Sequence, residues 1–103
     1  MTRLRFACGL YDRMQALYTG EVKPEGIELD FVVIDAPRKI FDRMAGAQEF
    51  DAAELSCSEF IARRSAGDDS FVALPVFPSR SFRHGLISIN ASRGIRAPGD
   101  LAG

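Results

Sequence analysis

The sequence has little of what marks a nucleic-acid-binding, membrane-spanning or exported protein. Its 103 residues carry a net charge of −1, which provides no field for nucleic acid or an anionic membrane. No apolar run approaches the roughly 20 residues of a membrane span. The first residues alternate apolar and charged positions, where a signal peptide needs a continuous apolar segment. We therefore expect a cytoplasmic protein without nucleic-acid or membrane partners.

Metal-ligating residue types are also scarce. The two cysteines, Cys8 and Cys57, lie far apart in the sequence and have no CxxC partner. His84 is the only histidine, so too few soft ligands are present for a structural zinc site. We predict no metal site and expect both cysteines to be reduced, partly buried thiols.

What the sequence does contain is an alternation of short β-like runs and amphipathic helical patterns. A chain of 103 residues has room for one domain with one modest core. The alternation is typical of βαβ units and of a mostly parallel sheet, so we predict an α/β fold in three layers. Strands are predicted at residues 3–8, 27–34, 50–55, 71–77 and 85–90, and helices at residues 11–18, 37–47 and 57–66.

Two of the helix starts have clear local signals. Asp35 can cap free backbone amides, and Pro37 is tolerated in a first helical turn. Ser56 and Glu59 have the spacing of a capping box. The start of a helix at residue 57 is therefore the best-specified boundary in the chain.

Polar side chains gather after three of the predicted strands, where open α/β sheets bind their ligands. The segments are residues 9–13, 54–58 and 78–84, and the last concentrates serines, arginines and the histidine around one aromatic ring. Arginine matches a carboxylate in two parallel hydrogen bonds, and hydroxyl groups can complete the shell. The pattern indicates one wall of an anion-binding cleft. Its candidate residues are Tyr11, Asp12, Arg13, Glu54, Ser56, Ser79, Arg80, Arg83 and His84.

Each candidate also has a purely structural interpretation. The arginines of residues 78–84 can belong to a solvated loop that pairs with nearby aspartates. Glu54 can cap or pair with an arginine, and Asp12 favours the positive end of a helix dipole that Arg13 balances. A single histidine beside a strand is more often a hydrogen-bonded structural residue than a catalyst. The residues alone leave both interpretations open.

Four strings resemble, in order and at similar spacing, the amino-terminal region of 4,5-dihydroxyphthalate decarboxylases. They are ACGLYDRMQAL, VKPEGIELDFVVI, FDRMAGAQEFDAAELS and ALPVFPSRSFRHGLISIN, which together cover nearly the whole chain. The most specific parts are YDR at residues 11–13, EFD and ELS within residues 49–56, and PVFPSRSFRH at residues 75–84. The strands between these motifs are generic.

This resemblance implies an incomplete three-layer α/β lobe of a type 2 periplasmic-binding-protein-like fold, in which two lobes hold a ligand between them. Residues 1–90 would form the first lobe, with residues 85–90 as its crossover strand. Residues 91–103 would begin the linker into a second lobe that these residues do not include. Uncovered apolar surface and sheet edges would then leave the chain marginally stable or forming a homo-oligomer.

The implied activity is the non-oxidative decarboxylation of 4,5-dihydroxyphthalate or a similar aromatic carboxylate, which needs no cofactor. His84 is implied as the proton donor, and Arg80 or Arg83 as the group that holds the retained carboxylate. Glu54, Ser56 and Ser79 would position ring hydroxyls. We expect this chain alone to be inactive.

Two alternatives to the decarboxylase remain open. One is a solute-binding protein of a transporter for a small carboxylate, without catalysis. The other is another cytoplasmic enzyme of this fold, similar to the chorismate dehydratase of menaquinone synthesis.

Overall fold

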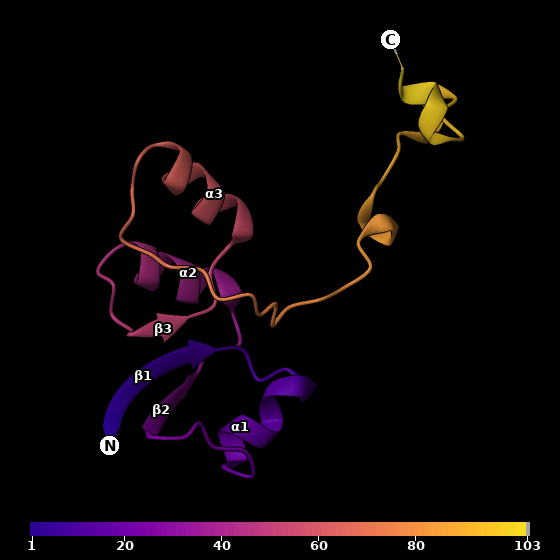
Figure 1. The fold of residues 1–103 in the computed structure, drawn as a ribbon. Helices are drawn as coiled ribbons and strands as arrows, with labels where there is room; N and C mark the ends of the chain where they lie inside the picture. The colour runs from indigo at the N-terminus through magenta and orange to yellow at the C-terminus, as the bar shows by residue number, and fades with distance from the viewer. Residues whose placement is uncertain (103) are drawn as a thin grey trace.

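The computed structural model describes residues 1–102 and shows a small α/β body from which the last part of the chain extends (Figure 1). Strand β1 (Thr2–Cys8) lies between β2 (Ile27–Val33) and β3 (Ala52–Ala53), and both neighbours run parallel to it. The register sets Phe6 beside Phe31 and Ala7 beside Ala53. The parallel sheet with its connecting helices confirms the predicted α/β class.

The two faces of the sheet are covered by different helices, because side chains alternate along a strand. On one face the rings of Phe6 and Phe31 meet edge to face at 5.0 Å between centroids. Tyr18 of α1 (Gln15–Thr19) packs on Phe31 from the same side at 5.5 Å. On the other face, Ala7 lies in a buried cluster with Ile40 of α2 (Pro37–Ala45) and Phe50. Helices α1 and α2 therefore lie against opposite faces.

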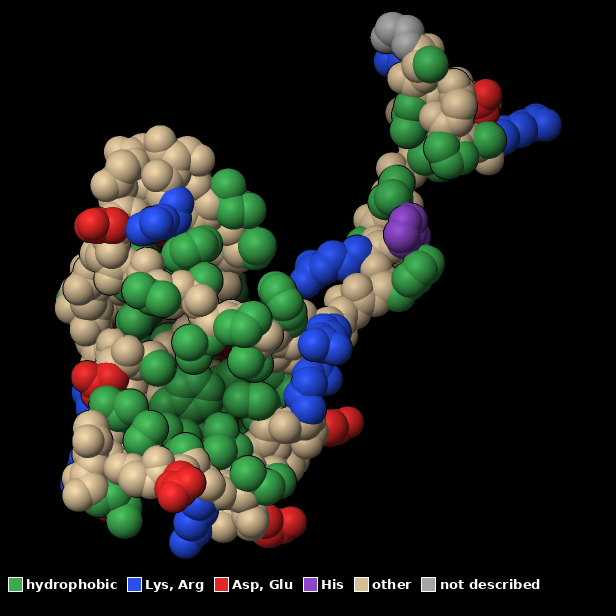
Figure 2. All heavy atoms as spheres, in the orientation of Figure 1, with side chains coloured by type: hydrophobic (Ala, Val, Ile, Leu, Met, Phe, Trp, Pro, Cys, Tyr) green, Lys and Arg blue, Asp and Glu red, His purple; other side chains and the backbone are tan. Residues whose placement is uncertain are grey.

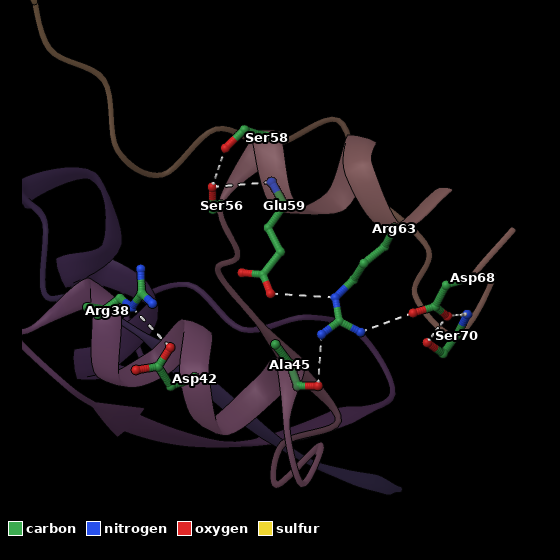
Figure 3. A network of polar contacts seen from close by, with 9 residues as sticks. All are labelled: Arg38, Asp42, Ala45, Ser56, Ser58, Glu59, Arg63, Asp68 and Ser70. Carbon is green, nitrogen blue, oxygen red and sulfur yellow. Dashed lines mark hydrogen bonds and ion pairs between the residues drawn. The ribbon is translucent and has the colours of Figure 1, made fainter. Parts of the chain in front are cut away.

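Helix α3 (Cys57–Ser65) is held mainly by polar contacts, because none of its side chains is buried. The Ser56 hydroxyl accepts a hydrogen bond from the Glu59 amide at 3.4 Å, which confirms the predicted helix start. Arg63 donates to the Ala45 carbonyl at 3.1 Å and pairs with Asp68 at 3.0 Å (Figure 3). The Ala45 contact ties α3 to the end of α2.

Several predicted boundaries need correction. Pro37 occupies the first turn of α2 as predicted, but the cap position is Ala36, and Asp35 makes no side-chain cap. The first helix begins as a 3-10 turn (Asp12–Met14) before α1. The third strand is only Ala52–Ala53, and Phe50 before it lies in the buried core cluster.

The prediction of strands at residues 71–77 and 85–90 is wrong for this structure. Both segments lie within the described residues, and neither contains a strand. Only a 3-10 turn (His84–Leu86) overlaps the second segment. A strand needs a hydrogen-bonding neighbour, and in the described range β3 pairs only with β1. Residues 79–102, here called the arm, instead run away from the body with three short 3-10 turns (Figure 1).

The arm and the residues before it leave an unusual amount of apolar surface open to solvent. The described chain has an accessible surface of 8028 Å², whereas a folded protein of this mass exposes about 5,700 Å². Its radius of gyration is 18.2 Å, against about 13 Å for a compact domain of this length. The large apolar side chains exposed in this part of the chain are Val72, Leu74, Val76, Phe77, Phe82, Leu86, Ile87, Ile89 and Leu101.

We therefore predict that the chain self-associates in solution. Exposed apolar patches of this extent favour association, and the free edge of β3 offers unpaired backbone groups. Sedimentation velocity should give an average mass above that of the monomer and rising with protein concentration. Replacing Leu86, Ile87 and Ile89 together by serine should lower that mass, whereas serine at Val22 and Ile61 should change it less.

A monomeric boundary at every concentration, together with a sharp thermal transition, would contradict this prediction.

None of the helices in the described range has the length and apolar character that crossing a bilayer takes.

Candidate functional site

A buried carboxylate lies where β1 and β3 end at the same edge of the sheet. Glu54 directly follows β3 and is 8% exposed. Its Oε1 accepts a hydrogen bond from the Gly9 amide at 2.8 Å, and its Oε2 accepts one from the Tyr11 hydroxyl at 3.0 Å. Both donors belong to the loop after β1. Glu54 therefore joins the carboxyl ends of two neighbouring strands.

Gly9 is the position at which this arrangement has no room for a side chain. A Cβ atom there would lie 3.1 Å from the Tyr11 ring and 3.4 Å from Glu54 Oε1. The aromatic ring therefore lies directly against the glycine backbone. Gly9 lies in the predicted ligand-binding loop but was not among the predicted site residues. A glycine directly after a predicted strand was the available signal.

Burial and the Glu54 charge set the protonation of the neighbouring groups. The pKa of the Tyr11 hydroxyl is raised, first by burial and then by its hydrogen bond to Glu54, while the Ser79 hydroxyl acts in the lowering direction. Burial, followed by the Glu54 charge, raises the pKa of the Cys8 thiol from 9.0 to about 12. Tyr11 is thus a neutral donor at physiological pH. Cys8 is a neutral thiol and not a nucleophile.

The two cysteines should consequently differ in reactivity. Cys8 is buried and protonated, whereas Cys57 is exposed at the start of α3. We expect a thiol reagent such as dithionitrobenzoate to label one cysteine quickly and the second only after denaturant is added. A Cys57→Ser variant should lose the fast phase alone. Two fast phases in the native protein would contradict the buried position of Cys8.

A cavity of about 1260 Å³ opens beside Glu54 and extends around β3. Its walls are mainly apolar and come from both faces of the sheet, including Phe6, Leu17 and Phe41, together with the segment that follows α3. Figure 2 shows apolar side chains gathered over this part of the body, with Lys and Arg side chains near the base of the arm. The candidate residues that line the cavity are Glu54, Ser56, Ser79 and Arg83.

Two other candidates, Tyr11 and Arg13, connect the loop after β1 to the base of the arm. Tyr11 reaches the site through its bond to Glu54. The Arg13 guanidinium lies 5.2 Å from the centre of the Tyr11 ring and donates a hydrogen bond to the Pro78 carbonyl. Arg13 thereby holds the segment before Ser79 against the loop that carries Tyr11. Asp12 lies exposed in the 3-10 turn between them.

The remaining candidates lie outside the cavity lining. Arg80 is exposed and donates to the Phe77 carbonyl at 3.3 Å. His84 is exposed on the arm, with its ring centroid 4.5 Å from that of Phe82. Asp68 is one of the aspartates near the loop arginines in the sequence, and it pairs with Arg63 instead. The functional roles of Arg80 and His84 stay predictions.

Within residues 1–102, no group of three or more His, Cys, Asp or Glu side chains is placed to hold a metal ion. The site therefore consists of one buried carboxylate, a phenol, hydroxyl groups and an arginine beside an apolar cavity. Such a combination suits a small ligand with an apolar body and a few polar groups.

Known proteins that are similar to the chain in sequence include two decarboxylases. No protein-family model matches the chain. A 4,5-dihydroxyphthalate decarboxylase of Comamonas testosteroni is 42% identical over 101 residues, covering 98% of this chain and 30% of the relative. A protein of the same name from Pseudomonas putida is 41% identical over 100 residues, covering 97% of this chain and 38% of the relative. The resemblance found in the sequence is thereby confirmed, and the chain spans about a third of the length of these relatives.

Proposed function

We propose that this chain forms one wall of the ligand cleft of a cytoplasmic carboxy-lyase. Its substrate would be 4,5-dihydroxyphthalate or a similar aromatic carboxylate. The observation that carries the proposal is identity above 40% to two decarboxylases of that name along nearly all of the chain. The cavity supports it, because Glu54, Ser56, Ser79 and Arg83 are among the polar groups of a mainly apolar lining.

The reaction removes one carboxylate as carbon dioxide and leaves 3,4-dihydroxybenzoate. A ring hydroxyl para to the departing carboxylate pushes electrons into the ring while an acid protonates the carbon that bears this carboxylate. His84 is proposed as the acid. Arg83 or Arg80 would hold the retained carboxylate, because guanidinium and carboxylate pair in two parallel hydrogen bonds.

The proposed setting for this chemistry is a two-lobe, type 2 periplasmic-binding-protein-like fold with the substrate between the lobes. The exposed apolar residues from Val72 to Ile89 support it, because they would need a further part of the protein to cover them. The other substrate contacts on this wall would be Tyr11, Asp12 and Arg13 in the loop after β1.

A solute-binding function without catalysis is the second candidate. The observation that favours it is that the cavity carries binding groups while His84, the proposed acid, lies outside its lining. The same kind of cleft can capture a ligand or transform it, since fold does not determine function.

Calorimetric titration of an intact relative with 4,5-dihydroxyphthalate, paired with measurement of carbon dioxide release, separates these functions. Phthalate, which lacks the ring hydroxyls, is the matched control ligand. Binding with formation of 3,4-dihydroxybenzoate supports the decarboxylase, and binding without product supports the solute-binding function. Equal affinity for phthalate and its dihydroxy derivative would contradict recognition of the hydroxyls in either case.

A further inference from the structure

Glu54 is a buried carboxylate without a cationic partner. Among the ion pairs in residues 1–102, none includes Glu54, and its two hydrogen-bond donors are neutral groups. A carboxylate has about four lone-pair positions. The Gly9 amide and the Tyr11 hydroxyl occupy two of them. Acceptor capacity therefore remains at a side chain that lines the cavity.

The other groups at this edge do not compete for the same role. Tyr11 and Cys8 both have raised pKa values and stay protonated at physiological pH. Asp51 is the second carboxylate of the cavity lining, but it is exposed at the opposite end of β3 and accepts the Arg5 amide at 2.8 Å. Glu54 is thus the buried proton acceptor of the cavity wall.

We propose that Glu54 is the base that takes the proton of the ring hydroxyl para to the departing carboxylate, so that the site selects catechol-type carboxylates. This inference rests on the proposed decarboxylation. The Tyr11 hydroxyl donates to Glu54 and keeps its own oxygen lone pairs, which can accept a hydrogen bond from the neighbouring ring hydroxyl. Two adjacent hydroxyls would therefore meet two adjacent acceptors.

The step balances in protons and electrons. The Glu54 carboxylate removes the hydroxyl proton, and the resulting phenolate electrons move into the ring as the para carbon takes a proton from the acid. The bond between that carbon and its carboxylate then breaks. Its electron pair restores the aromatic phenolate as carbon dioxide leaves. The phenolate finally takes back the proton from Glu54, so that one proton is consumed overall and Glu54 is regenerated.

Glu54→Gln tests this role with little change in shape. Glutamine keeps a carbonyl oxygen for the Gly9 amide, and its amide group can donate to the Tyr11 oxygen. In an intact relative that carries these residues, we expect kcat to fall about 100-fold or more, while the dissociation constant for 4,5-dihydroxyphthalate changes by only a few-fold. Glu28→Gln, at an exposed position of β2, is the matched control and should leave both values unchanged.

A binding measurement reads the contact between Glu54 and the hydroxyl apart from turnover. The wild type should bind 3,4-dihydroxybenzoate more tightly than 3,4-dimethoxybenzoate, which has no hydroxyl proton to donate, and Glu54→Gln should lose this preference. A preference that persists in the variant would overturn the role of Glu54. Should Glu54→Gln fail to fold, the intact relative with its wild-type residues can be given 4,5-dimethoxyphthalate, whose hydroxyl protons are blocked. Decarboxylation of this ether at a normal rate would also overturn the inference.

The two proposals can fail separately. Carbon dioxide release that is equal in the wild type and in Glu54→Gln would leave the decarboxylase standing and remove Glu54 as its base. A preference for free hydroxyls that depends on Glu54, without any carbon dioxide release, would support the contact and the choice of catechols while contradicting the decarboxylase.

Discussion

Replacing Phe50 by alanine is expected to lower the free energy of unfolding by about 3 to 5 kcal/mol. Phe50 is 4% exposed and is one of only two large apolar side chains, with Ile40, that are buried in the described part of the chain. The guanidinium groups of Arg43 and Arg5 lie 4.7 and 5.5 Å from its ring centre and lose their aromatic partner as well. Because so small a core leaves little margin, most Phe50→Ala molecules should be unfolded at 25 °C.

Urea denaturation followed by circular dichroism measures this loss. Phe82→Ala is the matched control, because Phe82 is 82% exposed on the arm. Its effect should stay within about 0.5 kcal/mol. If the two variants lose similar amounts of stability, Phe50 does not form the core described here.

The elements that were predicted correctly are those with local causes. Strand β1 follows from alternating positions and β2 from a near-continuous apolar run, and α3 begins where the Ser56 cap and Glu59 indicate. Residues 71–77 have equally strong strand character, yet they form no strand in the structure. A sheet also needs a neighbour with free backbone groups, and that neighbour is not encoded in the segment itself.

The candidate site could be predicted in part for a similar reason. Parallel strands end at one edge of a sheet, so the loop after β1 and the residues after β3 had to be close together. The bond between Tyr11 and Glu54 confirms that these two segments meet. The close approach of Gly9 to the Tyr11 ring was not predictable, because it depends on atomic distances. Arg80 and His84 follow residues 71–77, which form no strand. Their positions therefore could not be predicted from the end of a strand.

In an intact relative that carries this segment, His84→Ala is expected to lower turnover of 4,5-dihydroxyphthalate about 100-fold or more while leaving its affinity nearly unchanged. A general acid acts in the transition state, and its removal leaves the groups that bind the carboxylates in place. Arg83→Ala should have the reverse effect, because it removes a charge-assisted hydrogen bond at the cavity wall. The binding free energy should become less favourable by about 1.5 to 3 kcal/mol, which raises the dissociation constant roughly 10- to 150-fold.

The test pairs steady-state turnover with calorimetric affinity in each single variant, with Arg96→Ala as an exposed control on the arm. The side chains of Arg83 and His84 are both exposed in the structure, so their contributions require the arm to be covered when the substrate binds. A covered arm should therefore also become protected from proteolysis on addition of 4,5-dihydroxyphthalate. Normal turnover in His84→Ala would remove His84 from the mechanism. Unchanged affinity in Arg83→Ala would assign the carboxylate contact to another group, for which Arg80 is the next candidate on this wall.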